Sequence, residues 1–129
     1  MPLQAYRPNA AQMAEMKTIL LVEDEVDIAE VLCDVLELEG HRVVIAFDGR
    51  QGLDRARERA PDLVITDLMM PVMDGIEMIE RIRALPGLGK APVIAISAAN
   101  YDGDEVFLRK PFDVYELIAL VHAALDPKR

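Results

Sequence analysis

Short apolar runs alternate with stretches of helical periodicity, and this alternation restricts the fold more than any other feature of the chain. After the first run, apolar residues recur three and four positions apart, as on one face of a helix, and Gly40 suits the left-handed position that closes it. Strands that are apolar on both sides and joined by helices pair in parallel, with helices on both faces of the sheet. We therefore predict an α/β domain with a parallel sheet. Its expected strands are residues 18–22, 42–46, 63–66, 93–96 and 106–108.

Four expected helices begin with the same motif, an aspartate followed three residues later by Glu or Gln. In a capping box the first side chain accepts hydrogen bonds from free backbone N–H groups, and the second reaches back to the cap. We expect the motif to start helices, and we expect Glu25 to be only a cap or turn residue. The aspartates are Asp27, Asp48, Asp74 and Asp113.

Residues 1–16 precede the first apolar run and lie outside the repeating pattern. Asn9 and Gln12 would cap a short helix that ends at Met16, and a mobile tail is the alternative interpretation. We predict an N-terminal extension over 1–16, either tail or short helix, and one folded domain over 17–127.

Composition excludes several classes of function. The 129 residues, 52% of them hydrophobic, suffice for one domain with a full core. A net charge of −9 disfavours binding to nucleic acid or to an anionic membrane. The single cysteine, Cys33, cannot form an internal disulfide, and we expect it to be a small core residue. No apolar run approaches 18 residues, and the N-terminus does not resemble a signal peptide. We expect a cytoplasmic protein.

Polar residues with complementary chemistry follow the expected strands. In open parallel sheets, ligands bind beyond the carboxyl ends of the strands, so these residues should meet at one edge. Clustered carboxylates repel one another unless a cation lies among them, and a few acidic oxygens suit magnesium. A carboxylate that faces a metal ion, an ammonium and a hydroxyl is arranged to accept a phosphoryl group. The residues are Glu23, Asp24, Glu25, Asp67, Ser97 and Lys110.

These motifs together resemble the response-regulator receiver domain, the phosphorylated half of two-component signalling. The matching segments are ILLVEDE at 19–25, DLVITDLMMPVMDG at 62–75, VIAIS at 93–97 and FLRKPF at 107–112. The resemblance covers about 17–127. It implies a flavodoxin-like, doubly wound sheet of five parallel strands in the order 2-1-3-4-5.

The resemblance implies a role for each residue of the acidic cluster. Asp67 would accept the phosphoryl group from a phosphohistidine, with Mg²⁺, or alternatively Mn²⁺, as the cofactor. Asp24, Asp67 and the main-chain carbonyl of Met69 would bind the metal ion. Glu23 would complete the acidic pair, at a position where the family often has Asp.

The resemblance also implies the parts of a switch. Ser97 would form a hydrogen bond to the phosphoryl group, and Lys110 would pair with a phosphoryl oxygen. The Lys110–Pro111 peptide bond would be cis and would direct Lys110 inward. Phe107 occupies the position of the family's switch aromatic, and a plain core residue is the alternative interpretation. Met69 and Ala99 flank the path of an attacking water and cannot orient it, which predicts slow loss of the phosphoryl group.

Partners follow from the same resemblance. A histidine kinase or a histidine phosphotransfer protein would donate the phosphoryl group, and an unknown protein would receive the signal. One alternative is a receiver fragment of a hybrid kinase or multidomain regulator. A magnesium phosphatase would need a second acid at Met69, and a flavin or nucleotide carrier would need a phosphate-binding loop at 23–25. We predict a signalling domain and not an enzyme.

The connection between the last two strands is unusually short. Ser97 and Lys110 lie 13 positions apart, and the family has a longer segment there, with a fourth helix. A strand of about 16 Å can be retraced by an extended loop over 98–104, which reaches at most about 25 Å. Gly103 suits a turn in this loop. We predict that the fourth helix is absent or reduced to one turn.

Loss of that helix would leave part of the sheet uncovered near the last two strands. The N-terminal segment, with Leu3, Tyr6 and Met13, is one candidate to cover it, and a partner protein is the other. The family's usual surface for dimerisation or output must also differ in this chain.

Overall fold

The computed structural model describes residues 8–126. In chain order the elements are α1 (Ala10–Glu15), β1 (Thr18–Val22), α2 (Val26–Leu38), β2 (Arg42–Ala46), α3 (Gly49–Glu58), β3 (Leu63–Asp67), α4 (Gly75–Arg83), β4 (Val93–Ser97), β5 (Val106–Arg109) and α5 (Val114–Leu125).

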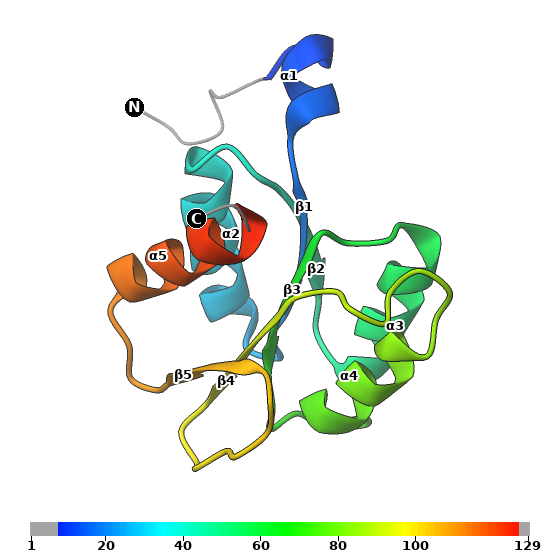
Figure 1. Ribbon diagram of the computed structural model, residues 1–129. Coiled ribbons are helices and arrows are strands. Elements are labelled where there is room, and N and C mark those ends of the chain that lie inside the picture. The colour runs from blue at the N-terminus through cyan, green and yellow to red at the C-terminus, as the bar shows by residue number, and fades with distance from the viewer. Residues whose placement is uncertain (1–7, 127–129) are drawn as a thin grey trace.

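The strands form one parallel sheet in the order β2-β1-β3-β4-β5, as predicted. In Figure 1, α2 and α5 cover one face, and α3 and α4 cover the other. Side chains alternate between the two faces along each strand. In β1, Ile19 and Leu21 pack toward α2 and α5, whereas Leu20 and Val22 pack toward α3 and α4. The doubly wound α/β fold is therefore confirmed.

Most of the expected helix boundaries are confirmed. Asp48, Asp74 and Asp113 are N-cap residues whose carboxylates accept backbone N–H bonds from the first turn. Gly40, directly after the α2 C-cap, has a φ of 93°, which favours glycine. Each of these caps lies at an end where the chain passes between a helix and the sheet.

The predicted cap at Asp27 is wrong. A cap at Asp27 implies a helix that starts at residue 28, but α2 starts two residues earlier, at Val26. Asp27 lies in the first turn, where the helix dipole favours a carboxylate. Glu25 occupies the N-cap position without a side-chain cap bond. Its N–H instead donates to the buried Glu23 carboxylate, at 3.1 Å. This turn binds the helix start to the end of β1 and so sets the boundary.

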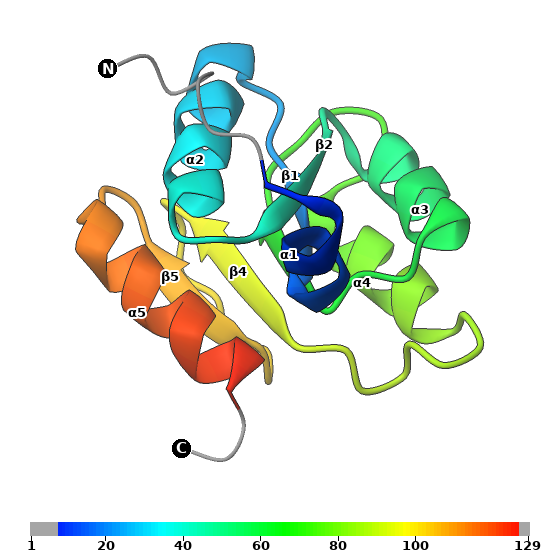
Figure 2. The ribbon, with the colours of Figure 1, turned by 90° about the horizontal axis from the view of Figure 1, so that it is seen from above.

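Of the two interpretations of the N-terminal extension, the described residues show the short helix: α1 has a reciprocal capping box between Asn9 and Gln12. It lies at the amino end of β1, opposite the carboxyl ends of the strands (Figures 1 and 2). There the Arg42 guanidinium of β2 donates to the Met13 carbonyl, at 3.3 Å. The expectation that Met13 covers β4 and β5 is wrong, because two residues link α1 to β1 and β3 separates β1 from β4. Leu3 and Tyr6 lie outside the described residues.

The chain passes from β4 to β5 without a helix, as the short connection predicted. The loop at 98–105 brings the Tyr101 ring against Phe107 of β5, with ring centroids 5.7 Å apart. The Tyr101 hydroxyl donates to the Glu105 carboxylate, and Glu105 pairs with Arg83 of α4 at 3.4 Å. We call Tyr101, Glu105 and Arg83 the Tyr101 clasp. It covers Phe107 on the α3 and α4 face, where no helix follows β4.

The Tyr101 clasp connects three segments of the chain. Arg83 also donates to the carbonyls of Gly89 and Ala91, at 3.2 and 3.0 Å, in the loop before β4. Burial and the adjacent Glu105 carboxylate raise the pKa of Tyr101 to about 12, so its hydroxyl stays protonated. A Cβ at Gly103 would overlap the Tyr101 ring and hydroxyl. Glycine at 103 therefore permits the close approach that the clasp requires.

Replacing Tyr101 with Ala should lower the free energy of unfolding by about 2–3 kcal/mol, because a half-buried ring and its contact with Phe107 are lost. Tyr101→Phe keeps the ring and removes only the bond to Glu105, which should cost about 1 kcal/mol. Urea denaturation of the two variants measures both effects. If Tyr101→Ala were as stable as the wild type, the loop would not substitute for the missing helix.

Candidate functional site

Asp67 is held at the carboxyl end of β3, and its side chain is almost buried. Its Oδ1 accepts the Met69 N–H at 3.1 Å. The Gly75 N–H donates to the Leu68 carbonyl at 3.0 Å, which brings the start of α4 against the end of β3. A Cβ at Gly75 would overlap the Asp67 carbonyl oxygen, so only glycine fits this contact. The glycine that follows Asp74 thus allows the turn that presents Asp67.

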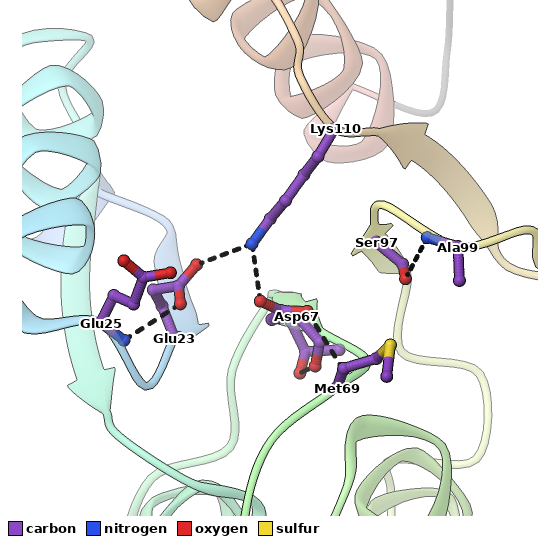
Figure 3. A network of polar contacts seen from close by, with 8 residues as sticks. Glu23, Glu25, Asp67, Met69, Ser97, Ala99 and Lys110 are labelled. Carbon is purple, nitrogen blue, oxygen red and sulfur yellow. Dashed lines mark hydrogen bonds and ion pairs between the residues drawn. The ribbon is translucent and has the colours of Figure 1, made fainter.

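Lys110 reaches Asp67 from the end of β5. Its N–H donates to the Ser97 carbonyl at 2.9 Å, which extends the pairing of β5 with β4. The Lys110–Pro111 peptide bond is cis. The ammonium Nζ lies 2.7 Å from Asp67 Oδ2 and 3.6 Å from Glu23 Oε1 (Figure 3). Burial acts to lower the pKa of Lys110, but these carboxylates raise it above its ordinary value, so the group stays charged.

The acidic pair comes from the end of β1. Glu23 is only 3% exposed, whereas Asp24 is exposed. Glu23, Asp24 and Asp67 each offer an oxygen atom, and these atoms all lie within 4.8 Å of one another. Burial raises the pKa of Glu23, and the Asp67 charge adds to this, while the Glu25 N–H and Lys110 oppose it. Three carboxylates this close fit a hard divalent cation such as Mg²⁺ or Mn²⁺.

Ser97 lies at the end of β4, and its side chain is buried. Its Oγ accepts the Ala99 N–H at 3.1 Å (Figure 3). Because a hydroxyl can accept one hydrogen bond and donate another, this contact leaves the Ser97 proton available for a second partner. Ser97 is thus on the same edge of the sheet as Asp67 and Lys110.

Two of the predicted site residues, Met69 and Phe107, do not bring their side chains to Asp67. Met69 follows Asp67 in the β3–α4 turn, where its N–H contacts the carboxylate and its side chain is exposed. Phe107 packs with the core on the α3 and α4 face and against Tyr101. The role of Tyr101 and Glu105 was missed in the sequence. The sequence signal for this contact was Tyr101 followed two residues later by Gly103, in a loop that is too short to form a helix.

A family model described as the response regulator receiver domain matches residues 19–122 of the chain. The chain belongs to the response regulator receiver family. Its receiver domain is 40% identical over 118 residues to the response regulator GtcR of Aneurinibacillus migulanus, and the match covers 84% of this chain and 48% of that protein. It is also 40% identical over 116 residues to YkoG of Bacillus subtilis, an uncharacterized transcriptional regulatory protein, covering 83% and 50%.

Solved structures agree with this assignment. The receiver domain of the hybrid histidine kinase CckA has a TM-score of 0.74 and 36% identity, with 84% of this chain and 98% of that chain covered. The chemotaxis protein CheY4 of Vibrio cholerae has a TM-score of 0.80 and 27% identity, with 85% and 99% covered. The chain spans about half the length of the curated relatives it matches. Among residues 8–126, no helix has the length and apolar character needed to cross a membrane.

Proposed function

We propose that Asp67 accepts a phosphoryl group from a phosphohistidine of a histidine kinase or a histidine phosphotransfer protein. The observation that carries this proposal is the meeting of three carboxylates with one ammonium at a single sheet edge. Glu23, Asp24 and Asp67 would hold Mg²⁺ or Mn²⁺ together with the main-chain carbonyl of Met69. The bound metal ion would neutralise charge that develops on the phosphoryl oxygens.

The chain's own residues supply the other parts of the reaction. A carboxylate oxygen of Asp67 forms a bond to phosphorus, while the bond from phosphorus to the histidine nitrogen breaks and the imidazole leaves with the electron pair. Lys110 transfers its contact from the free Asp67 carboxylate to a phosphoryl oxygen. Ser97 donates its free hydroxyl proton to another phosphoryl oxygen, and Phe107 follows this movement as the switch aromatic.

The proposed output is signalling in the cytoplasm through contact with a downstream protein, and not catalysis on an external substrate. Met69 occupies the position where a phosphatase with an Asp nucleophile would carry a second acid, and its thioether cannot transfer a proton. The match covers about half of each curated relative, which supports the alternative that the receiver is part of a larger regulator or hybrid kinase.

Intact-mass measurement with a small phosphodonor tests the proposal. We expect an adduct of about 80 Da in the presence of Mg²⁺ and little or none in EDTA. Peptide mapping should place the adduct on Asp67. Absence of an adduct, or an adduct on another residue, would overturn the proposed phosphoacceptor.

The phosphoryl group on Asp67 should decay slowly. Met69 and Ala99 follow Asp67 and Ser97 by two residues and lie on the Ser97 side of Asp67 (Figure 3). Neither side chain can accept a hydrogen bond strongly enough to orient a water molecule. We expect a half-life of minutes or longer, measured as loss of the adduct mass after the phosphodonor is removed. Met69→Gln, which adds an amide at similar length, should shorten it. Decay within seconds in the wild type would contradict this reasoning.

A further inference from the structure

An apolar groove lies beside the candidate phosphorylation site. Its volume is about 610 Å³, and it separates the β3–α4 turn from the loop at 98–105. Met69, Met70 and Ile76 line one wall. Ala99 and Tyr101 line the other. Polarizable methionines on a surface suit contacts with varied apolar side chains, so the lining is that of a protein-binding groove.

The wall formed by the β3–α4 turn exposes apolar side chains and has a strained backbone. Met69 is 67% exposed, and Ile76 is 47% exposed. At the tip of the turn, Val72 is 83% exposed and has a φ of 71°. The Met73 N–H donates to the Pro71 carbonyl at 2.8 Å, which closes a three-residue turn around Val72. A β-branched residue rarely adopts this conformation, and such strain is concentrated at functional sites.

The charged residues that line the groove or lie in the loop at 98–105 are acidic. Asp74 lines it, and Asp102 and Asp104 are exposed in the loop that forms its other wall. Asp104 is close enough to Tyr101 to contribute, after burial and Glu105, to the raised pKa of its hydroxyl. These carboxylates favour an occupant with positive charge.

The neighbouring cations already have partners among the described residues. Arg83 pairs with Glu105, and Arg109 donates to the Asn100 side chain at 2.6 Å. Lys110 pairs with Asp67. The acidic residues at the groove are therefore not neutralised by these basic groups. A second copy of this chain, with its own net charge of −9, would be repelled.

We propose that this groove docks a short amphipathic helix of the downstream protein, with large apolar side chains between lysines or arginines. The apolar side chains fill the space between Ile76 and Tyr101, and the basic side chains approach Asp74 and Asp104. The proposal rests on the proposed function in one respect, since it names the surface through which phosphorylation of Asp67 is read.

Ser97 and Ala99 connect the groove to the phosphorylation site. Both residues line the groove, and the Ser97 hydroxyl accepts the Ala99 N–H at 3.1 Å. When Ser97 donates to a phosphoryl oxygen on Asp67, its movement carries Ala99 with it. The wall opposite Met69 then shifts, so affinity for the helix changes with phosphorylation.

Peptide binding to the full chain tests the proposal. The probe is a fluorescent peptide of about 14 residues, with Leu and Phe at helical spacing and Lys between them, and a matched peptide carries Glu in place of Lys. We expect the Lys peptide to bind at least about tenfold more tightly than the Glu peptide, and to weaken as salt is added. Phosphorylation should change its affinity at least about threefold.

Variants and NMR locate the bound peptide. Ile76→Ser should weaken binding about tenfold. Leu38→Ser, which alters an exposed apolar residue at the far end of α2, should leave binding unchanged. With ¹³C-methyl methionine, the Met69 and Met70 signals should shift, and that of Met13 in α1 should not.

Each other outcome overturns part of the proposal. No binding of the Lys peptide, tighter binding of the Glu peptide, or an unchanged affinity in Ile76→Ser would exclude the basic helix as occupant. Concentration-dependent dimers that Ile76→Ser abolishes would assign the groove to a second copy. The adduct mass is recorded in the same samples. An adduct without a change in peptide affinity would disprove the link to phosphorylation. Absence of an adduct would disprove the proposed function, and peptide binding to the unmodified protein would then test the groove by itself.

Discussion

Replacing Asp67 with Asn should abolish phosphorylation of the chain. An amide oxygen carries no negative charge and is a poor nucleophile, so the rate should fall at least about a thousandfold, or about 4 kcal/mol of transition-state stabilisation. The fold should persist, because Asn has the same shape and can still accept the Met69 N–H at Oδ1. The measurement is the time course of the adduct of about 80 Da with Mg²⁺ and a small phosphodonor.

Asp54→Asn is the matched control for this variant. Asp54 lies in α3 with its side chain about half exposed, and it pairs with Arg50 and Arg57 at 3.9 and 3.6 Å. Such surface pairs contribute little to stability. The variant should be phosphorylated at the wild-type rate. An adduct that formed equally fast on Asp67→Asn would move the phosphoacceptor to another carboxylate, with the exposed Asp24 the first to test.

The fold could be predicted from the sequence because its signals are local and repeated. Apolar strands require cover on both faces, and the caps at Asp48, Asp74 and Asp113 mark where helices begin. The meeting of Asp67 and Lys110 followed from strand ends alone, since parallel strands bring their carboxyl ends to one edge. The contact was predictable even though Asp67 and Lys110 are 43 residues apart in the chain.

The prediction failed where the outcome depends on which side chains the fold buries and on contacts between distant segments. Asp27 has the sequence of a capping residue, yet a bond between Glu25 and the buried Glu23 sets the helix start. Likewise, Met13 had no local signal that would place it beside Arg42 and away from β5. A side chain's partner across the fold is decided by packing geometry, which a single sequence does not encode in its spacing.

The side chains that cover β5 are a second case in which sequence spacing did not reveal the packing partners. Sequence spacing correctly predicted that no full helix follows β4, because reach along the chain is a matter of length. It did not predict that Tyr101 would fold back on Phe107, or that Arg83 would anchor Glu105 from α4. The edge that carries Asp67 and Lys110 therefore followed from strand order, while the cover of β5 depends on contacts between distant segments.

Replacing Gly75 with Ala should lower the free energy of unfolding by about 2–4 kcal/mol. Helix propensity alone predicts the opposite sign, because Ala is favoured over Gly by about 1 kcal/mol within a helix. The added Cβ would overlap the Asp67 carbonyl oxygen and lie 2.9 Å from Leu68 Cα, and backbone atoms cannot rotate away as a side chain could. Urea denaturation measures the loss, and slower adduct formation should accompany it because the turn that holds Asp67 must move.

Gly89→Ala provides the control that separates steric overlap from a general effect of losing glycine. A Cβ at Gly89 meets only the Arg83 carbonyl oxygen, at 3.7 Å, which is an ordinary contact. That variant should stay within about 0.5 kcal/mol of the wild type, or gain slightly from reduced freedom of the unfolded chain. If Gly75→Ala behaved in the same way, β3 and α4 would not be in close contact at this turn. The position of Asp67 would then depend on Lys110 and the Met69 N–H alone.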